Sequence, residues 1–344
     1  MFKNIKILLI NFLIFILLIS IIELIFGNKF FSSKLDCTYL LCSANYSYKN
    51  DLYEPNGLIN YKKDKYGFRG LRKNINEIDI LTIGGSTTDE RYLETGDTWS
   101  EQLETKINNF YPNLNFDIVN AGIDGQSTYG HIWNFENWFP KLENFKTKYI
   151  FFYIGLNEYF SKERQLSDRG TKNLNYFQVI KYWLKENNGI IYKSYYLIYR
   201  KYYLKDVLNV GHKIRELKYK PIETSFLIND ENIKELNYRL DKLIKLTKKN
   251  NSIPIFITQR TQRHKIINNV IYSINDINYY SKEKQYSEII MKNCKKNKIF
   301  CIDLFNKIDF TKNSLYDLVH TTPEGANLVA NIIFDEFKFI LNDN

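Results

Sequence analysis

The sequence predicts a three-layer α/β fold, in which helices cover both faces of a parallel five-stranded sheet and one membrane-spanning helix precedes it. Short apolar runs without helical spacing recur along the chain, which is typical of strands buried on both faces. Helical segments lie between these runs, and the alternation indicates a parallel sheet with right-handed crossovers. A long apolar stretch at the N-terminus accounts for the additional helix.

Residues 1–27 are predicted to be an uncleaved signal-anchor helix. Lys3 and Lys6 mark the beginning of an apolar stretch, Ile5–Phe26, which is long enough to span a bilayer. No small-x-small cleavage site follows, which argues against a cleaved signal peptide. Because basic residues favour the cytoplasmic side, we expect a single-pass protein with a cytoplasmic N-terminus and a periplasmic or extracellular main domain.

Residues 28–75 are expected to form a stalk and an irregular arm, and residues 76–344 the main domain. Five strands are predicted there, at Ile78–Ile83, Phe116–Asn120, Tyr149–Ile154, Ile253–Thr258 and Ile299–Leu304. The helices predicted between them include Trp99–Phe110 and Glu283–Lys295. Residues 160–250 exceed the length of a plain crossover, so a helical insertion is expected.

The predicted insertion is rich in tyrosine, and basic residues are interleaved between Tyr192 and Tyr203. Aromatic rings stack on sugar faces and basic groups bind carboxylates, so a lid or a substrate platform is one interpretation. An ordinary helical cap with its own core and surface is the other. The residue types leave both open.

The most informative motif is the segment Ile78–Asp89, IDILTIGGSTTD. Its two glycines permit a tight turn directly after the strand and leave room for a ligand beside the main chain. Ser86 follows at the mouth of this turn, where a helix can begin and direct its free N–H groups at an anion. A simple turn has the same pattern, so a role for Ser86 as nucleophile depends on a base and an acid elsewhere.

A second motif, Asp317-Leu-Val-His320, supplies that base and acid. Thr322 is a natural N-cap and Pro323 suits the first position of a helix whose apolar face packs on the core. The loop that carries the motif is therefore held by a buried helix. Since a serine hydroxyl needs a base and an orienting carboxylate, we expect His320 and Asp317 to fill these roles.

Two further blocks each place a polar group at the end of a strand. The first reads FDIVNAGIDGQS from Phe116, and the second reads YIFFYIGLNE from Tyr149. A tetrahedral oxyanion requires preorganised hydrogen-bond donors, and Gly125 and Asn157 stand where such donors are needed. Plain turn roles remain open for both blocks.

In chain order, the GGST, turn-glycine, GLNE and DLVH blocks resemble those of the SGNH hydrolases, also called the GDSL family, which supply Ser, Gly, Asn and His in this order. The resemblance implies a flavodoxin-like sheet order with the active site at the carboxyl edge. It implies that Ser86 is the nucleophile, His320 the general base and Asp317 its orienting group. The implied oxyanion hole consists of the N–H groups of Ser86 and Gly125 and the side chain of Asn157, with Gly122 as the less suitable alternative to Gly125.

The sequence departs from the usual pattern of the family at two positions. Gly85 replaces the aspartate of a GDS block, and Glu158 stands where Gly-x-Asn-Asp is common. Neither change touches the nucleophile. We expect the carboxylate of Glu158 to support the loop around Asn157. The resemblance covers residues from about 78 to 158 and from about 250 to 340 and does not extend to the N-terminal segment or the middle of the chain.

Cysteines and charge bear on the compartment and the partners. Cys37 and Cys42 are close enough in sequence for a small disulfide loop, and Cys294 and Cys301 either pair or remain buried thiols. No His/Cys cluster indicates a metal, and no cofactor is expected. The net charge of +10 and the pI near 9.1 favour anionic partners such as phospholipid headgroups or acidic glycans. Nucleic acid is not expected for a domain outside the cytoplasm.

Together these features predict a membrane-anchored serine esterase that hydrolyses ester groups, above all O-acetyl groups, on envelope or extracellular carbohydrate. An O-acetyltransferase that passes the same acyl group to a glycan is the main alternative, because one acyl-enzyme serves both reactions. A lipid esterase and a non-catalytic glycan-binding scaffold are the others. The presence of Ser86, Asn157, Asp317 and His320 together argues against the scaffold.

Overall fold

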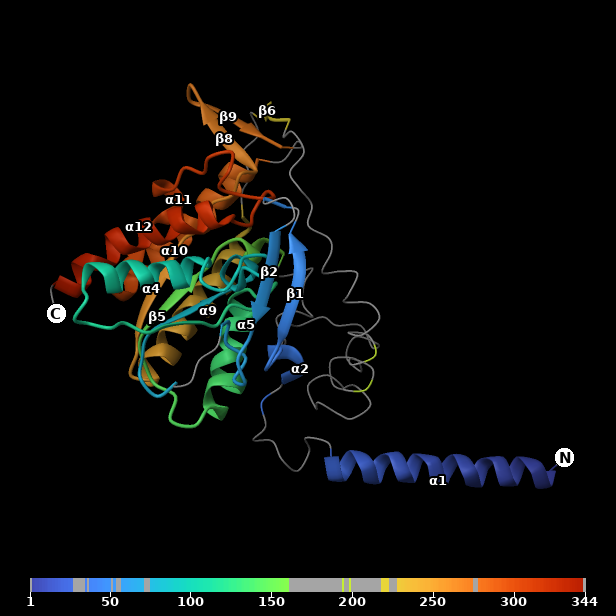
Figure 1. Cartoon of the computed structure of the whole chain (residues 1–344). Helices are drawn as coiled ribbons and strands as arrows, with labels where there is room; N and C mark the ends of the chain where they lie inside the picture. Colours follow the sequence, from blue (N-terminus) through green and yellow to red (C-terminus); the bar gives the residue numbers. More distant parts are fainter. Residues whose placement is uncertain are drawn as a thin grey trace. The chain divides into compact units, whose positions relative to one another are not determined.

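The structure is a computed structural model of the chain (Figure 1). It describes residues 2–26, 35, 37–50, 52–53, 57–70, 75–160, 194, 198, 218–222, 228–274 and 278–342. Two compact units are described separately, the first comprising Met1–Leu40 with Lys172–Val210 and the second Leu41–Thr171 with Gly211–Asn344. Helices α1 (Phe2–Phe26) and α2 (Cys37–Leu40) belong to the first unit.

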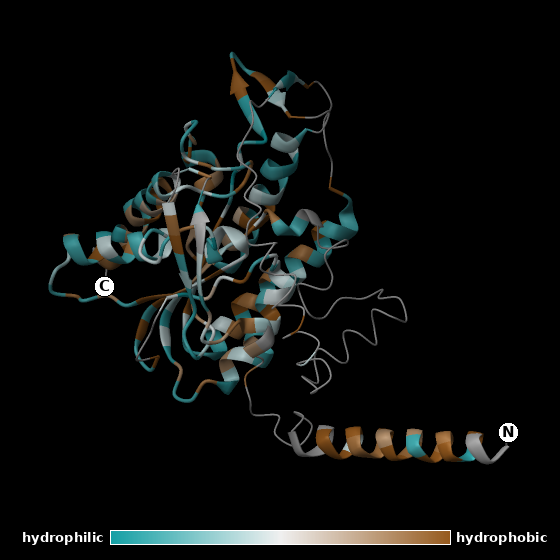
Figure 2. Cartoon of the chain, turned by 45° about the vertical axis from the view of Figure 1, so that its right-hand side comes forward, coloured by the Kyte–Doolittle hydropathy of each residue, from teal (hydrophilic) through white to brown (hydrophobic). Residues whose placement is uncertain are grey.

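Helix α1 is long and apolar enough to cross a membrane. Its mean hydropathy is 2.9 over Ile5–Ile22, and none of this span is buried. Figure 2 shows hydrophobic residues along almost the whole helix. A helix that is apolar all round has no polar face for water, so its length and composition are those that the predicted anchor requires.

The second unit is built on a sheet of five parallel strands. In chain order the strands are β3 (Ile78–Gly84), β4 (Ile118–Asn120), β5 (Thr147–Tyr153), β7 (Ile253–Ile257) and β10 (Cys301–Ile302). Their spatial order is β4-β3-β5-β7-β10, which is the flavodoxin-like order 2-1-3-4-5. The predicted fold class and all five predicted strands are confirmed.

Helices cover both faces of this sheet (Figure 1). Helices α4 (Trp99–Phe110) and α12 (Pro323–Asn342) pack together on one face, and α5 (Thr128–Trp133), α9 (Asp230–Lys249) and α10 (Tyr279–Asn297) form the other layer. Successive side chains of β5 enter the two layers in turn. The ring of Phe151 lies 5.0 Å from that of Phe337 in α12, whereas Phe152 stacks 6.2 Å from Phe135 in the π-helical turn η1 (Asn134–Trp138).

Strands β1 (Asn45–Asn50) and β2 (Gly57–Lys62) form an antiparallel pair within the segment predicted as stalk and arm. Ile59 and Tyr61 are buried, while their neighbours along β2 are not, which is the alternation of a half-buried strand. A β-bridge from Arg69 to Asn120 joins the arm to the edge of the central sheet. The arm is therefore packed on the domain.

A second antiparallel sheet contains β6 (Lys220–Pro221), β9 (Val270–Ser273) and β8 (His264–Ile267). The two-residue turn between β8 and β9 consists of Asn268 and Asn269, with φ angles of 49° and 64°. Asparagine tolerates this left-handed conformation, which the primed turns of tight hairpins require. The sequence analysis did not predict these strands.

Most of the predicted insertion at residues 160–250, including its tyrosine-rich part, lies outside the described residues. Its end forms most of helix α9, which begins with the side chain of Asn229 accepting a hydrogen bond from the N–H of Asn232. Cys294 and Cys301 form a disulfide between α10 and β10, and Cys37 and Cys42 are also disulfide-bonded. The remaining short helices are α3 (Ser86–Asp89), η2 (Phe139–Lys141), η3 (Asn157–Phe160) and α11 (Leu304–Lys307).

A buried pair of titratable groups, Glu283 and His264, lies between α10 and β8. Burial raises the pKa of Glu283 to about 7, although its carboxylate accepts hydrogen bonds from the hydroxyl and the N–H of Thr261. Burial also lowers the pKa of His264 to about 3, so its ring is neutral at physiological pH. The folded state thus binds a proton at Glu283 in a pH range where the unfolded state does not.

Replacing Glu283 with glutamine is expected to change how stability depends on pH. Because the folded-state pKa of Glu283 is raised from 4.5 to about 7, the wild type should lose stability relative to Glu283→Gln as the pH rises through this window. Between pH 4.5 and pH 8, the unfolding free energy of the wild type should fall by about 3 kcal/mol relative to that of Glu283→Gln. Urea unfolding at pH 4.5 and pH 8 measures it, and a constant difference would show that Glu283 titrates normally.

Candidate active site

Ser86 lies at the end of the central strand β3 and begins helix α3. The chain turns there through Gly84 and Gly85. A Cβ at position 84 would lie 2.1 Å from the hydroxyl oxygen of Thr88, so the turn requires glycine. The seryl hydroxyl oxygen lies 2.8 Å from Nε2 of His320.

His320 and Asp317 lie on the loop that precedes α12. Their side chains meet at 2.6 Å between Nδ1 of His320 and Oδ2 of Asp317. The other carboxylate oxygen accepts hydrogen bonds from the N–H groups of Val319 and His320, both at 2.7 Å. The loop packs tightly against the beginning of α12. A Cβ at Gly325 would lie 1.9 Å from the carbonyl oxygen of Ser314, so this close contact requires glycine. The structure thus brings Ser86, His320 and Asp317 into one hydrogen-bonded chain.

The electrostatics of this chain favour an ionised carboxylate. Burial alone would raise the pKa of Asp317, but the hydrogen bond and charge of His320, with the two backbone N–H groups, lower it below its usual value. An ionised carboxylate at this distance favours the tautomer of His320 that carries its proton on Nδ1. Nε2, which faces Ser86, is then the nitrogen that can accept the seryl proton.

Asn157 lies beside the turn that carries the serine. Its side-chain amide nitrogen donates a hydrogen bond to the carbonyl oxygen of Gln126 at 2.7 Å. The same nitrogen lies only 2.1 Å from where a Cβ would stand at Gly85. The glycine that departs from the GDS pattern is therefore what allows Asn157 to approach this closely.

Gly125 immediately precedes Gln126 in the turn after β4, and its φ of 77° is in the left-handed region. Gly122, the alternative oxyanion donor, is engaged elsewhere. Its N–H donates to the side chain of Asn120 at 2.9 Å, and its carbonyl accepts from the ammonium of Lys63 at 3.0 Å. The N–H and the carbonyl of Gly122 are therefore both engaged within the fold.

Glu158 follows Asn157 and is buried. Its carboxylate accepts hydrogen bonds from the N–H and hydroxyl of Thr128 at 2.7 and 2.9 Å, and from the guanidinium of Arg239 at 2.9 Å. These contacts tie the Asn157 segment to the beginning of α5 and to α9. Glu158 is thus a structural support for this edge of the site.

Two buried charged residues behind the serine were missed by sequence reasoning. Lys63 is 3.5 Å from the carboxylate of Asp89, the last residue of α3, and both side chains are at most 2% exposed. The hydroxyl of Tyr61 donates to the same carboxylate at 2.8 Å. Lys63 therefore connects the helix that carries Ser86 with the turn that carries Gly122 and Gly125.

Glu90 forms a second connection, between the serine helix and the histidine loop. It accepts a hydrogen bond from the hydroxyl of Thr321, which follows His320, and another from the N–H of Trp99 at 2.7 Å. Burial raises the pKa of Glu90 well above the ordinary value. No sequence signal distinguishes Glu90 from a surface glutamate, because its partners are distant in sequence.

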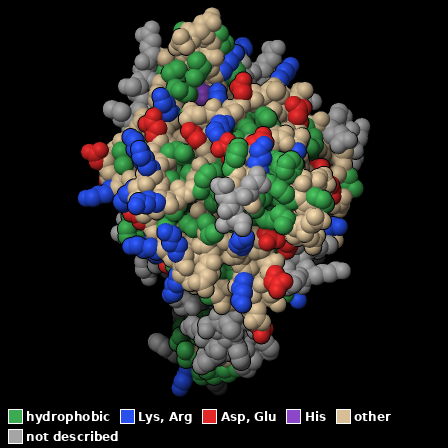
Figure 3. All heavy atoms as spheres, turned by 90° about the vertical axis from the view of Figure 1, so that its left-hand side faces the viewer, with side chains coloured by type: hydrophobic (Ala, Val, Ile, Leu, Met, Phe, Trp, Pro, Cys, Tyr) green, Lys and Arg blue, Asp and Glu red, His purple; other side chains and the backbone are tan. Residues whose placement is uncertain are grey.

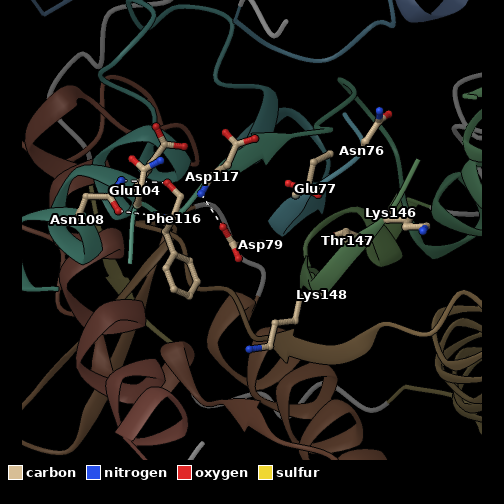
Figure 4. Close-up of a pocket in the computed structure, with 12 residues that line it drawn as sticks. Asn76, Glu77, Asp79, Glu104, Asn108, Phe116, Asp117, Lys146, Thr147 and Lys148 are labelled. Carbon is tan, nitrogen blue, oxygen red and sulfur yellow. Dashed lines mark hydrogen bonds between the residues drawn. The ribbon is translucent and has the colours of Figure 1, made fainter. Parts of the chain in front are cut away.

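A hollow of about 780 Å³ lies at the opposite, amino edge of the sheet (Figure 4). Two of its acidic side chains accept hydrogen bonds from backbone N–H groups of the strand β4 segment. Asp79 accepts from the N–H of Asp117 at 2.9 Å, and Glu104 accepts from the N–H of Ile118 at 2.6 Å. These groups cap strand ends, so this hollow is explained by the fold. In the part of the chain that the structure describes, no group of three His, Cys, Asp or Glu side chains is arranged for a metal ion.

Comparisons with known proteins find similar solved structures. Neither a protein-family model nor a curated protein matches the sequence. A lipolytic protein of the G-D-S-L family from Veillonella parvula is 17% identical, with 76% of this chain and 98% of that chain covered and a TM-score of 0.43. An acetyl xylan esterase variant from Geobacillus stearothermophilus is 14% identical, covering 76% of this chain and 95% of that one, with a TM-score of 0.45. An alpha/beta hydrolase from the metagenome of Lake Arreo is 12% identical, covering 77% and 98%, with a TM-score of 0.44.

Proposed function

We propose that the protein is a serine esterase that removes acyl groups, above all acetyl groups, from carbohydrate outside the cytoplasm. The observation that carries the proposal is the continuous chain from Ser86 through His320 to Asp317, with contacts of 2.8 and 2.6 Å. These are the distances that proton transfer from a nucleophile to a base requires. Helix α1, with its capacity to cross a membrane, supports an anchored enzyme.

In the proposed reaction, the hydroxyl oxygen of Ser86 attacks the ester carbonyl carbon while Nε2 of His320 takes its proton. The oxyanion accepts hydrogen bonds from the N–H groups of Ser86 and Gly125 and from the second amide hydrogen of Asn157. His320 then protonates the leaving sugar hydroxyl, which leaves an acyl group on Ser86. A water molecule gives its proton to His320, attacks the acyl carbon and releases the acid, and Ser86 regains its proton.

The experiment that tests this function is turnover of p-nitrophenyl acetate by the full chain in detergent, with Ser86→Ala alongside. The wild type should release p-nitrophenol, and Ser86→Ala should release none above background while keeping the same circular dichroism spectrum. Equal release by both proteins would contradict the proposal. Adding a sugar acceptor separates the two fates of the acyl group, because a transferase would form sugar acetate in place of free acetate.

Gly85→Ala is expected to lower kcat by about 10²- to 10³-fold, the usual effect of losing one oxyanion donor. The added methyl group would stand 2.1 Å from the amide nitrogen of Asn157 and displace it. Asn157→Ala should cause a similar loss, and the double variant should lose little more than either single one, because both changes remove one donor. If the fold-loss in kcat of the double variant equals the product of the two single losses, Gly85 acts independently of Asn157.

A further inference from the structure

A groove of about 1270 Å³ lies beside the loop that carries the catalytic histidine. The arm, strand β8 and the segment before α12 all contribute to its lining. The described part of its lining includes the aromatic side chains of Tyr53, Tyr219, Phe310 and Tyr316. Aromatic rings provide flat apolar surfaces on which the faces of sugar rings can pack.

Tyr316 connects this groove with the proposed reaction centre. Its ring stacks on that of His320, with centroids 5.7 Å apart and planes at 11°. The rings of Tyr53 and Tyr92 lie against the ring of Tyr316, with centroid distances of 6.2 and 6.0 Å. The hydroxyl of Tyr53 donates a hydrogen bond to the carbonyl oxygen of Tyr92 at 2.8 Å. A chain bound in the groove would therefore lie next to the base.

The charge of the groove is positive. Among the described residues, four cationic side chains line it, Lys218, Arg260, Lys265 and Lys312, against two carboxylates, Asp309 and Glu324. The four cations form no ion pair among the described residues, although Arg260 donates to the carbonyl of Ile308 at 2.9 Å. The ammonium of Lys265 lies 4.3 Å from the centre of the Tyr219 ring, so charge and aromatic surface occur together.

On the face shown in Figure 3, basic and acidic side chains are interspersed. Unpaired cations that line a concave surface attract anions more strongly than the same number spread over a convex one. Cations interleaved with tyrosines suit a chain of sugars that carry carboxylates.

We propose that this groove is a substrate subsite for an acidic glycan, and that it holds a carboxylate-bearing sugar chain so that an ester on a neighbouring sugar reaches Ser86. The inference rests on the proposed function and names its substrate class. The lysines bind the carboxylates, and the half-buried rings of Tyr53, Tyr219 and Phe310 pack against the sugar rings, with the buried Tyr316 supporting them from behind.

The test measures binding and turnover separately on the full chain. Binding of a de-esterified oligogalacturonate to the Ser86→Ala protein is followed by calorimetry, with a neutral xylo-oligosaccharide of the same length as comparison. The variant Lys218→Ser/Lys265→Ser/Lys312→Ser removes three exposed cations of the groove. Lys245→Ser/Lys248→Ser/Lys292→Ser, on the exposed surfaces of α9 and α10, is the matched control for net charge.

The acidic oligosaccharide should bind and the neutral one should not, and the groove variant should weaken binding by roughly tenfold while the control leaves it unchanged. In the Ser86-containing protein, the groove variant should hydrolyse p-nitrophenyl acetate at the wild-type rate, because this small ester does not reach the groove. Equal binding of both oligosaccharides, or equal loss in both triple variants, would overturn the inference.

A second comparison distinguishes a glycan site from a site for any polyanion. Tyr219→Ala should weaken oligogalacturonate binding and leave the weaker attraction of inorganic polyphosphate unchanged. If polyphosphate binds as tightly as the oligosaccharide and Tyr219→Ala affects neither, the groove recognises charge alone and the glycan assignment is wrong. Failure of p-nitrophenyl acetate turnover with intact, groove-dependent glycan binding would instead refute the esterase function and leave the subsite standing.

Discussion

His320→Ala is expected to lower the turnover of p-nitrophenyl acetate by a factor on the order of 10⁴ or more, leaving only the residual catalysis that the oxyanion hole and substrate binding provide. The only base within hydrogen-bond distance of the Ser86 hydroxyl among the described residues is Nε2 of His320, at 2.8 Å. Without it, the seryl proton has no acceptor as the hydroxyl attacks. Steady-state kinetics on the purified full chain measures the loss.

Asp317→Asn is the matched variant for this prediction, because it keeps the size of the side chain. The amide oxygen can still accept from the N–H groups of Val319 and His320, but the charge that fixes the tautomer of His320 is lost. We expect a large loss in kcat with unchanged stability.

Activity of His320→Ala within about tenfold of the wild type would rule out the assigned base, since removal of a triad base costs far more.

Lys63→Met is expected to destabilise the protein by about 3–5 kcal/mol, the usual cost of removing one partner of a buried ion pair. The side chain of Lys63 is 2% exposed, and its loss leaves the buried carboxylate of Asp89 with less compensation. The carbonyl of Gly122 also loses its hydrogen bond. Chemical unfolding gives the free-energy change, and kcat measured below the unfolding transition shows whether the turn that carries Gly122 and Gly125 has moved.

The double variant Lys63→Met/Asp89→Leu tests the electrostatic reason for that cost. If the unpaired carboxylate causes the destabilisation, removing it as well should restore part of the lost free energy. A double variant that loses the sum of the two single effects would mean that packing, and not charge, accounts for the role of Lys63.

The central sheet could be predicted because the information for it is local. Apolar runs such as Ile78–Ile83 occur where strands are covered on both faces, and the glycines at 84 and 85 mark the turn after the first of them. The order of the motifs along the chain suggested which side chains would meet at the carboxyl edge. The resemblance to a known family supplied the pairing of Ser86 with His320, which are 234 positions apart.

The remaining features depend on contacts that no local pattern reveals. The pairing of β1 with β2 follows from the packing of the arm on the domain, where Ile59 and Tyr61 become buried. The Asn268–Asn269 turn was a usable signal for the β8–β9 hairpin, since asparagine accepts the φ angles that it requires. The Lys63–Asp89 contact had no such signal, because a lysine in a polar segment reads as solvated until the tertiary structure buries it.

The nucleophile is tested most directly by the intact mass of the full chain after brief exposure to p-nitrophenyl acetate, with Ser86→Ala treated in parallel. An acetyl adduct is expected on the wild type, mapped to Ser86 by peptide analysis, and none is expected on Ser86→Ala. An adduct on another residue, or p-nitrophenol release without any dependence on Ser86, would contradict the central claim that Ser86 is the activated nucleophile.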